Sequence, residues 1–227
     1  MIKKDYKNLW MSPNVVISRL DDLIKKYGLK TVIRKNEFRH EREGWIGGVF
    51  LLGLRELGEI TYWLEIETED STPDVYGSFL DVIETNTGKK GVRENFFSIE
   101  IVEWEEHGPS IVDLIKNKCK KHYPNNYFLL VYVRRGGKVL DYEKIVEELK
   151  GAKIPFAQIW ILVPSSNDHD YHLTKIYKGL FQIAFNLNDA IKKNEKQIKF
   201  ATNMGKGLAT EMENLGEISV PLPELEE

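Results

Sequence analysis

Apolar residues recur with a helical period near the start of the chain. The spacing predicts a first helix over residues 12–27, which Ser12 caps, Pro13 begins and Gly28 ends. A second helix is predicted from Glu37 or Glu41 to residue 57. The double glycine at 47–48 either weakens that helix locally or marks its close approach to a sheet.

The apolar period changes from helical to alternating after residue 58. Residues 60–67 place Tyr62, Leu64 and Ile66 on one face of a strand. Two further strands are predicted at 75–84 and 96–104, with a turn-rich segment between them. Three consecutive strands with short connections favour an antiparallel meander.

Helices and strands then alternate along the middle of the chain. A helix is predicted over 109–122, an almost continuous apolar strand over 127–133, an amphipathic helix over 141–151 and another apolar strand over 156–163. Strands of that kind are covered by other elements on both faces. The order strand, helix, strand predicts a right-handed crossover between parallel strands.

Residues 172–196 carry apolar positions at a spacing that predicts one long helix. Its stripe would face either the core or a partner, and in the second case the helix around 172–195 would be the seam of a homodimer. Residues 196–227 are predicted to form a peripheral helical and tail extension, since they end in a stretch rich in proline and glutamate.

These elements predict an α/β (α+β) protein with a central mixed β-sheet of about five strands flanked by helices. Residues 1–195 would form one domain, of which 1–36 are an N-terminal helical segment. A chain of 227 residues is long enough to bury one substantial core.

Composition and charge exclude only a few classes of function. A net charge of −3 neither requires nor excludes a nucleic-acid partner. The single cysteine, Cys119, excludes an internal disulfide and a cysteine-based zinc site. The N-terminus does not resemble a signal peptide and the longest apolar run is too short to span a bilayer, so a cytoplasmic location is expected.

Two acids on neighbouring predicted strands could hold a metal ion. Asp74 opens the second strand of the meander and Glu100 lies within the third, and a hairpin would bring them together. Carboxylates are the ligands that magnesium uses, together with several waters. Each acid also has an ordinary interpretation. Pro73-Asp74 is a common turn pair, and Glu100 would lie on the exposed face of a half-buried strand.

The order of these elements resembles the PD-(D/E)XK nuclease-like superfamily. The matching features are Pro73-Asp74, the run Glu100 to Val102, the helix from residue 109 and the strand at 127–133. The resemblance implies a restriction endonuclease-like fold and a metal-dependent nuclease acting on DNA phosphodiesters, in restriction, repair or mobile elements. Asp74 and Glu100 would be catalytic and would bind Mg²⁺ or Mn²⁺, assisted by Glu41 or Glu43.

The sequence departs from that family at one position. The family has a lysine two residues after the second acid, and this chain has Val102, which can neither donate a proton nor stabilise an anion. Replacements elsewhere in the chain are Lys116 or Lys118 on the next helix, or Lys89, Lys90 or Arg93 in the turn. The alternative function is a catalytically inactive module on the same fold that binds nucleic acid or protein.

Other polar groups have two interpretations each. Asp81 either joins an acidic cluster with Glu100 or makes an ion pair. Residues 168–172 offer aspartate and histidine as metal ligands or as caps of the following helix. The segment 134–138 either contacts phosphates or is a solvated loop; its basic residues are Arg134, Arg135 and Lys138.

Overall fold

The computed structural model describes residues 9–68, 72–84, 90–134, 139–167, 169–201 and 209–211. Within these residues the chain is an α/β protein built on one mixed sheet. Among the described residues, every helix is too short or too polar to span a bilayer.

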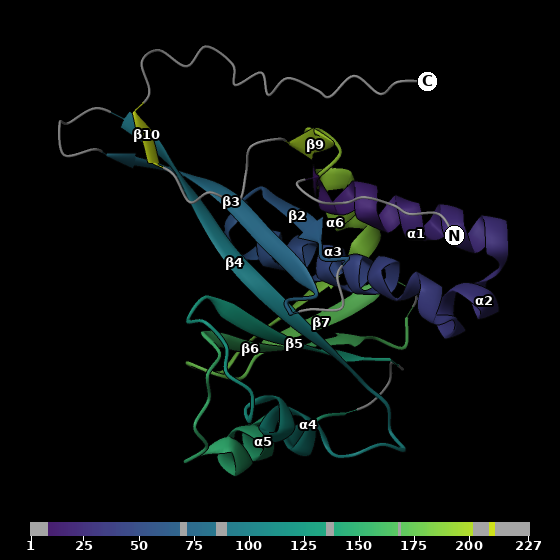
Figure 1. Cartoon of the computed structure of the whole chain (residues 1–227), viewed down its shortest axis with the longest axis vertical. Coiled ribbons are helices and arrows are strands. Elements are labelled where there is room, and N and C mark those ends of the chain that lie inside the picture. Colours follow the sequence, from purple (N-terminus) through teal and green to yellow (C-terminus); the bar gives the residue numbers. More distant parts are fainter. Residues whose placement is uncertain are drawn as a thin grey trace.

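Eight strands, β1 to β8, make up the main part of the sheet, and two short strands extend it (Figure 1). Their order is β8-β7-β6-β5-β4-β3-β2-β1-β9, with β10 paired to β4. The prediction of about five strands was therefore too low. The strands are β1 (Trp10–Met11), β2 (Tyr62–Ile66), β3 (Val75–Glu84), β4 (Lys90–Trp104), β5 (Tyr127–Val133), β6 (Gln158–Pro164), β7 (Asp170–Lys175), β8 (Phe181–Asn186), β9 (Phe200–Ala201) and β10 (Ala209–Glu211).

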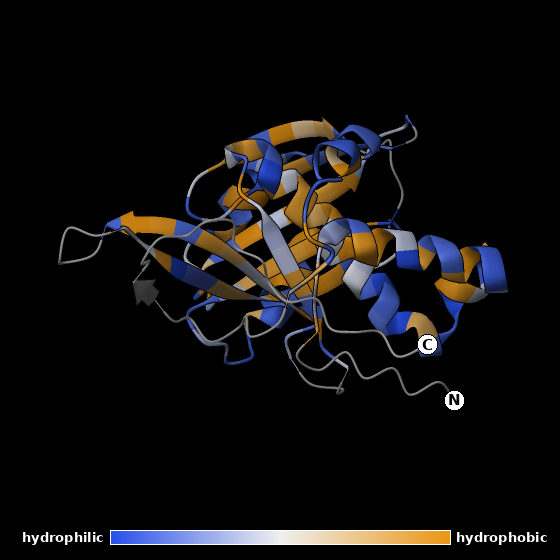
Figure 2. Cartoon of the chain, turned by 90° about the horizontal axis from the view of Figure 1, so that it is seen from above, coloured by the Kyte–Doolittle hydropathy of each residue, from blue (hydrophilic) through white to orange (hydrophobic). Residues whose placement is uncertain are grey.

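Helices cover both faces of this sheet. One apolar core joins α1, α3 and α6 to one face, and a second core joins α4 and α5 to the other. Figure 2 shows the apolar colouring concentrated in the sheet and on the inner side of the helices. The helices are α1 (Pro13–Tyr27), α2 (Leu29–Arg34), the short 3₁₀ helix η1 (Asn36–Phe38), α3 (Arg39–Gly58), α4 (Ile111–Lys118), α5 (Tyr142–Leu149) and α6 (Leu187–Lys193).

The predicted meander and crossover are both confirmed. Strands β2, β3 and β4 pair antiparallel, and β4, β5 and β6 pair parallel. Strand β5 is covered on both sides because Leu130 packs in the first core while Leu129 and Val131 pack in the second.

Helix α3 approaches the sheet closely at its glycines. A Cβ atom added at Gly47 would lie 3.3 Å from Val75, and one added at Gly44 would lie 2.5 Å from Cδ1 of Ile66. The glycines therefore mark close packing, which was one of the two interpretations of the pair at 47–48. This packing brings the first turns of α3 close to the start of β3.

The predicted long helix over 172–196 is wrong. Residues 170–186 form the antiparallel hairpin of β7 and β8, and only α6 at the end of the range is helical. Tyr171 and Leu173 alternate toward the core on β7, and the turn uses positive φ angles at Lys178 and Gly179. Apolar positions of two strands, separated by that turn, imitated a helical spacing. The predicted homodimer contact through a helix at 172–195 therefore has no such helix to form it.

Most of the predicted extension at 196–227 lies outside the described residues. Its described parts include β9, which pairs with β1, and β10, which pairs with β4. Both described segments, β9 and β10, are strands, whereas a helix was predicted there.

Candidate functional site

Asp74 lies directly before β3, where that strand separates from β4. Its backbone N–H donates to the carbonyl of Ile99 at 3.1 Å. Its carboxylate Oδ2 accepts a hydrogen bond from the backbone N–H of Ile101 at 2.7 Å. The side chain is buried, with an exposed fraction of 6% for the residue. The carboxylate is thus held against β4 beyond the last paired residue, Val75.

Glu100 is the second buried acid, with an exposed fraction of 2%. Its Oε1 accepts a hydrogen bond from Nζ of Lys118 and a longer one, at 3.4 Å, from the hydroxyl of Tyr123. Its Oε2 is buried and has no hydrogen-bond partner among the described residues. A buried carboxylate oxygen without a donor is energetically costly, so this atom is suited to bind a ligand that supplies positive charge.

Lys118 reaches Glu100 from the last turn of α4, whereas Val102 belongs to an apolar core. Val102 shares a strand face with Glu100 and is buried in the core beneath α4, together with Ile111 and Ile115. Lys118 was one of the replacements considered from the sequence. Lys116, the other lysine of that helix, is exposed.

An acid from α3 completes the surroundings of Asp74. Glu43 is buried, and its Oε1 accepts a hydrogen bond from Nε of Arg39 at 2.7 Å. The same guanidinium donates through Nη2 to Oδ1 of Asp74 at 3.4 Å. Glu41 is buried as well. Of the two α3 acids, Glu43 is the one whose charge acts on Asp74.

The electrostatics of the site favour a neutral Asp74 below about pH 7 in the absence of added cations. Burial raises the pKa of the Asp74 carboxyl to about 7, and the negative charges of Glu43 and Glu100 act in the same direction. The hydrogen bond from Ile101 and the charge of Lys118 oppose this shift in the pKa. Burial likewise raises the pKa of Glu43. A cation placed among these acids would favour their ionised forms.

The residues fit a magnesium or manganese ion held by two carboxylates. Within the described ranges, no group of three or more histidine, cysteine, aspartate or glutamate side chains is arranged to hold a metal. Magnesium commonly uses one or two carboxylates and keeps several waters. Oε2 of Glu100, which has no hydrogen-bond partner in the described residues, and Asp74 beside it match that requirement.

The remaining sequence candidates lie elsewhere or are already engaged. Arg134 pairs with Glu103 and Glu105, so its charge is already matched by two carboxylates. Arg135 and Lys138 lie outside the described residues, as do Lys89 and the side chain of Lys90.

Asp81 has the second of its two predicted roles. It accepts a hydrogen bond from Asn95 at 2.8 Å and pairs with Arg93 at 3.5 Å. Both contacts lie along the β3–β4 hairpin. Asp81 and Arg93 therefore stabilise the ladder between the two strands.

For the segment 168–172, neither of the two predicted roles, metal ligation or capping of a following helix, is found in the described residues. His172 lies within β7, so it does not precede a helix, and that interpretation was wrong. Asp170 accepts a hydrogen bond from Asn186 at 2.7 Å across the hairpin. Asp168 lies outside the described residues.

Two members of the site were missed from the sequence. Arg39 stands one helical turn before Glu43, a spacing that favours an ion pair. Tyr123 follows α4 in an irregular segment and is buried. The spacing of Arg39 was a usable signal, whereas nothing local to Tyr123 indicated its contact with Glu100.

Comparison with models of protein families finds no match, and comparisons with curated proteins and with solved structures also find none.

Proposed function

We propose that this chain is a metal-dependent nuclease that acts on DNA phosphodiesters, built on a divergent restriction endonuclease-like fold. The observation that carries the proposal is the contact of Lys118 with Glu100, beside the buried carboxyl of Asp74. Two acids and one lysine are the groups expected from the resemblance, although the lysine comes from a helix instead of the strand.

Each residue has a distinct role in the proposal. Asp74 and Glu100 would bind Mg²⁺ or Mn²⁺, which when bound neutralises charge on the phosphate and activates water. Lys118 keeps a positive charge at Oε1 of Glu100 and can orient or protonate a group near it. Arg39 bridges Glu43 and Asp74 and so fixes the orientation of the Asp74 carboxylate.

The arrangement of elements supports the same fold assignment. Helix α3 precedes an antiparallel meander, which is followed by α4 and the parallel strand β5. Asp74 lies where β3 separates from β4, and Glu100 lies on the side of the sheet that α4 covers.

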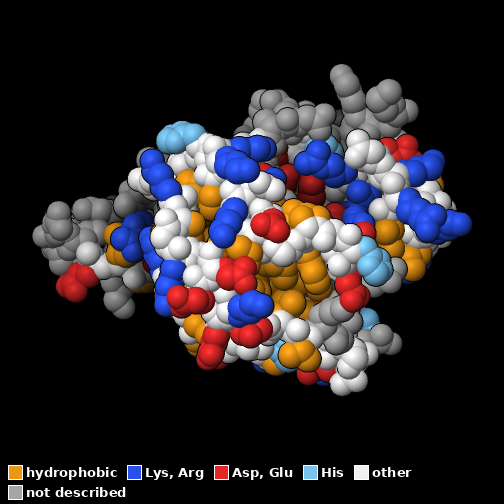
Figure 3. Space-filling view, turned by 90° about the horizontal axis from the view of Figure 1, so that it is seen from below, with side chains coloured by type: hydrophobic (Ala, Val, Ile, Leu, Met, Phe, Trp, Pro, Cys, Tyr) orange, Lys and Arg blue, Asp and Glu red, His pale blue; other side chains and the backbone are white. Residues whose placement is uncertain are grey.

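DNA is the proposed partner. Figure 3 views the molecule from below Figure 1, the side of α4 and α5, and shows lysine and arginine side chains gathered along part of the face with acidic atoms recessed between them. Positive side chains around recessed acids are suited to position a phosphate backbone over a metal site.

Cleavage of supercoiled plasmid in Mg²⁺ or Mn²⁺ tests this function. We expect nicking by the wild type, and its loss in Asp74→Asn and Glu100→Gln. Asp81→Asn is the matched control, because Asp81 is an acid of the same hairpin outside the site. Equal nicking by all four proteins, or by none, would overturn the proposal.

A second candidate function is a catalytically inactive module of the same fold that binds nucleic acid or protein. It is favoured by the charge balance of the site, since Lys118 pairs with Glu100 and Arg39 pairs with Asp74. This function predicts no heat of Mn²⁺ binding in calorimetry. Heat that is present in the wild type and absent in Glu100→Gln would exclude it.

A further inference from the structure

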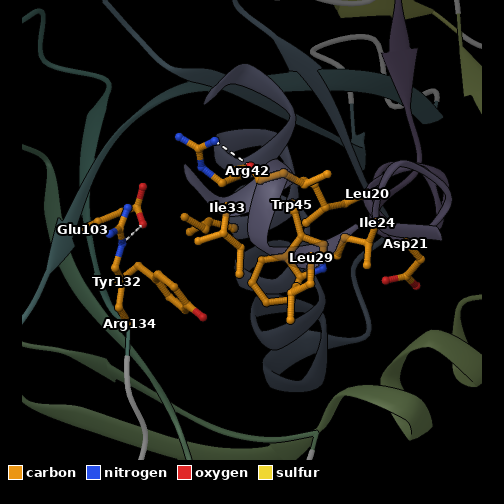
Figure 4. Close-up of a pocket in the computed structure, with 12 residues that line it drawn as sticks. Leu20, Asp21, Ile24, Leu29, Ile33, Arg42, Trp45, Glu103, Tyr132 and Arg134 are labelled. Carbon is orange, nitrogen blue, oxygen red and sulfur yellow. Dashed lines mark hydrogen bonds and ion pairs between the residues drawn. The ribbon is translucent and has the colours of Figure 1, made fainter. Parts of the chain in front are cut away.

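A cavity of about 260 Å³ lies between α1, α2 and α3 and the ends of β4 and β5 (Figure 4). Its lining includes Arg42 and Trp45 of α3 and Glu103 of β4. The volume is below the roughly 300–1,000 Å³ of sites for drug-sized ligands. It is therefore suited to a single small ring system.

The walls of the cavity are mainly apolar and include two aromatic rings. Trp45 and Tyr132 meet edge to face, with centroids 6.0 Å apart and an interplanar angle of 78°. The aliphatic side chains come from the two N-terminal helices and from α3: Leu20, Ile24, Leu29, Val32, Ile33 and Ile46. Aromatic and aliphatic walls of this kind favour a flat, apolar-faced ligand.

Arg42 is the lining side chain that backbone carbonyls hold in place, and one of its nitrogens has no hydrogen-bond partner among the described residues. Nη1 of Arg42 donates to the backbone carbonyls of Val32 at 2.9 Å and Lys35 at 2.8 Å. Nε of the same guanidinium is buried and makes no hydrogen bond within the described residues. A buried donor without an acceptor costs about 1–3 kcal/mol.

Charged groups stand at the other side of the cavity. Glu103 accepts a hydrogen bond from Nε of Arg134 through its Oε2, and Figure 4 shows this pair beside Tyr132, across from Trp45. A carboxylate and a guanidinium together can accept from and donate to the edge of one heteroaromatic ring.

The cavity and the acidic site share two elements. Arg42 and Trp45 flank Glu43 on α3, and Glu43 acts on Asp74. On β4, Glu103 lines the cavity three residues after Glu100, and its negative charge helps raise the pKa of Glu43. The cavity and the acids are thus neighbours along α3 and β4, although Glu103 and Glu100, three residues apart, face opposite sides of β4.

We propose that this cavity binds a nucleobase, with the ring between the aromatic and aliphatic walls and its polar edge toward Glu103 and Arg134. That the base belongs to DNA rests on the proposed function. A base turned out of a duplex and the base of a free nucleotide present the same chemistry, and the experiment separates these two sources.

Binding in EDTA tests the proposal without requiring cleavage. Fluorescence anisotropy would compare a duplex carrying one unpaired adenine with the same duplex carrying an abasic nucleotide at that position. Adenosine monophosphate is titrated separately by calorimetry. We expect the wild type to bind the adenine duplex about 10-fold more tightly than the abasic one, equivalent to about 1.4 kcal/mol.

Two tryptophan substitutions locate the effect. Ile33→Trp fills the cavity from a position that is 44% exposed, and should remove the preference for adenine. Leu57→Trp is the matched control at a 40% exposed position outside the lining, and should keep the preference. Equal thermal midpoints of the two variants show that both are folded.

The outcomes separate the cavity from the nuclease. Binding of adenosine monophosphate that Ile33→Trp abolishes, without a preference among duplexes, supports the cavity and makes free nucleotide the source. A wild type that shows neither the preference nor mononucleotide binding overturns the proposal, as does a preference that Ile33→Trp leaves intact. Loss of plasmid nicking in Glu100→Gln with an unchanged adenine preference supports both proposals separately.

Discussion

Nζ of Lys118 donates a hydrogen bond to Oε1 of Glu100 across 18 positions of sequence. The contact joins the last turn of α4 to the strand that α4 covers, and it leaves Oε2 of Glu100 buried without a donor among the described residues. One oxygen of the carboxylate is thus matched to a protein cation, and the other is suited to an added cation. The predictions on catalysis and metal binding depend on this difference between the two carboxylate oxygens of Glu100.

Removal of the lysine should reduce cleavage and spare metal binding. We expect Lys118→Ala to lower the nicking rate about 100-fold or more, the range for loss of an acid–base group. Mn²⁺ should bind this variant at least as tightly as the wild type, because a positive charge next to Glu100 is gone. Nicking kinetics and calorimetry measure the two effects.

The matched control is Lys116→Ala, on the same helix at an exposed position. Its nicking rate should equal that of the wild type. If both alanine variants lose activity equally, or if Lys118→Ala retains full activity, Lys118 has no catalytic role.

Stability in EDTA should depend on the protonation of Asp74. Burial raises the pKa of this carboxyl from 3.8 to about 7 in the folded chain. Between these values the folded state binds more protons than the unfolded state, so the free energy of unfolding falls as the pH rises, by at most about 1.4 kcal/mol per pH unit. Above about pH 7 the loss is complete.

Asp74→Asn removes this titration. The thermal midpoint of the variant minus that of the wild type should increase from pH 4 to pH 7 and then stay constant. Thermal melts in EDTA at several pH values, with Asp81→Asn as the control, measure the difference. A difference that is independent of pH would show that Asp74 ionises normally in the folded chain.

Bound metal should stabilise the wild type at pH 8. At a concentration about 100 times its dissociation constant, Mn²⁺ adds about 2.7 kcal/mol to the free energy of unfolding. For a chain of this size that corresponds to a rise of roughly 5–10 °C in the thermal midpoint. The rise should be absent in Glu100→Gln, and an equal rise in both proteins would place the ion elsewhere.

The close approach of α3 to the sheet should make Gly44 much less tolerant of substitution than Gly48. A Cβ at Gly44 would lie 2.5 Å from Cδ1 of Ile66, whereas one at Gly48 would meet its nearest atom at 3.4 Å. Both substitutions to alanine gain helix propensity equally. We therefore expect Gly44→Ala to be less stable than Gly48→Ala by about 1–3 kcal/mol in denaturant unfolding.

A second substitution tests the cause. Ile66→Val deletes the Cδ1 atom that Gly44→Ala would meet, so the double variant should recover part of the loss. Strict additivity of the two single effects would show that the crowded contact is not responsible.

The fold could be predicted wherever each element had its own apolar period. Residues 62–66 alternate and form β2, and residues 13–27 carry a helical stripe and form α1. The hairpin at 170–186 was mistaken for a helix because its two strands and its turn together imitate the spacing of one. The positive φ angles at Lys178 and Gly179 depend on the pairing of β7 with β8, which the local pattern does not specify.

The sequence named three acids of the candidate site, Asp74, Glu100 and, as one of two alternatives, Glu43. Asp74 and Glu100 follow from the hairpin between β3 and β4, which is local in sequence. Lys118 was one of several candidates because its approach depends on how α4 packs on β4. Arg39 and Tyr123 reach the acids from α3 and from the segment after α4, and these tertiary contacts have no signature in the strands themselves.

The hydrogen bond from Ile101 to Asp74 has a consequence for how such a site arises. In the antiparallel register that pairs Val75 with Ile99, the residue opposite Ile101 is Pro73. Proline has no backbone N–H to donate to β4, so the ladder ends there, and the N–H of Ile101 donates to the side chain of Asp74 in place of a backbone carbonyl. A carboxylate thus substitutes for the next residue of a strand. Lengthening β3 by one rung would convert the proposed reaction centre into ordinary sheet.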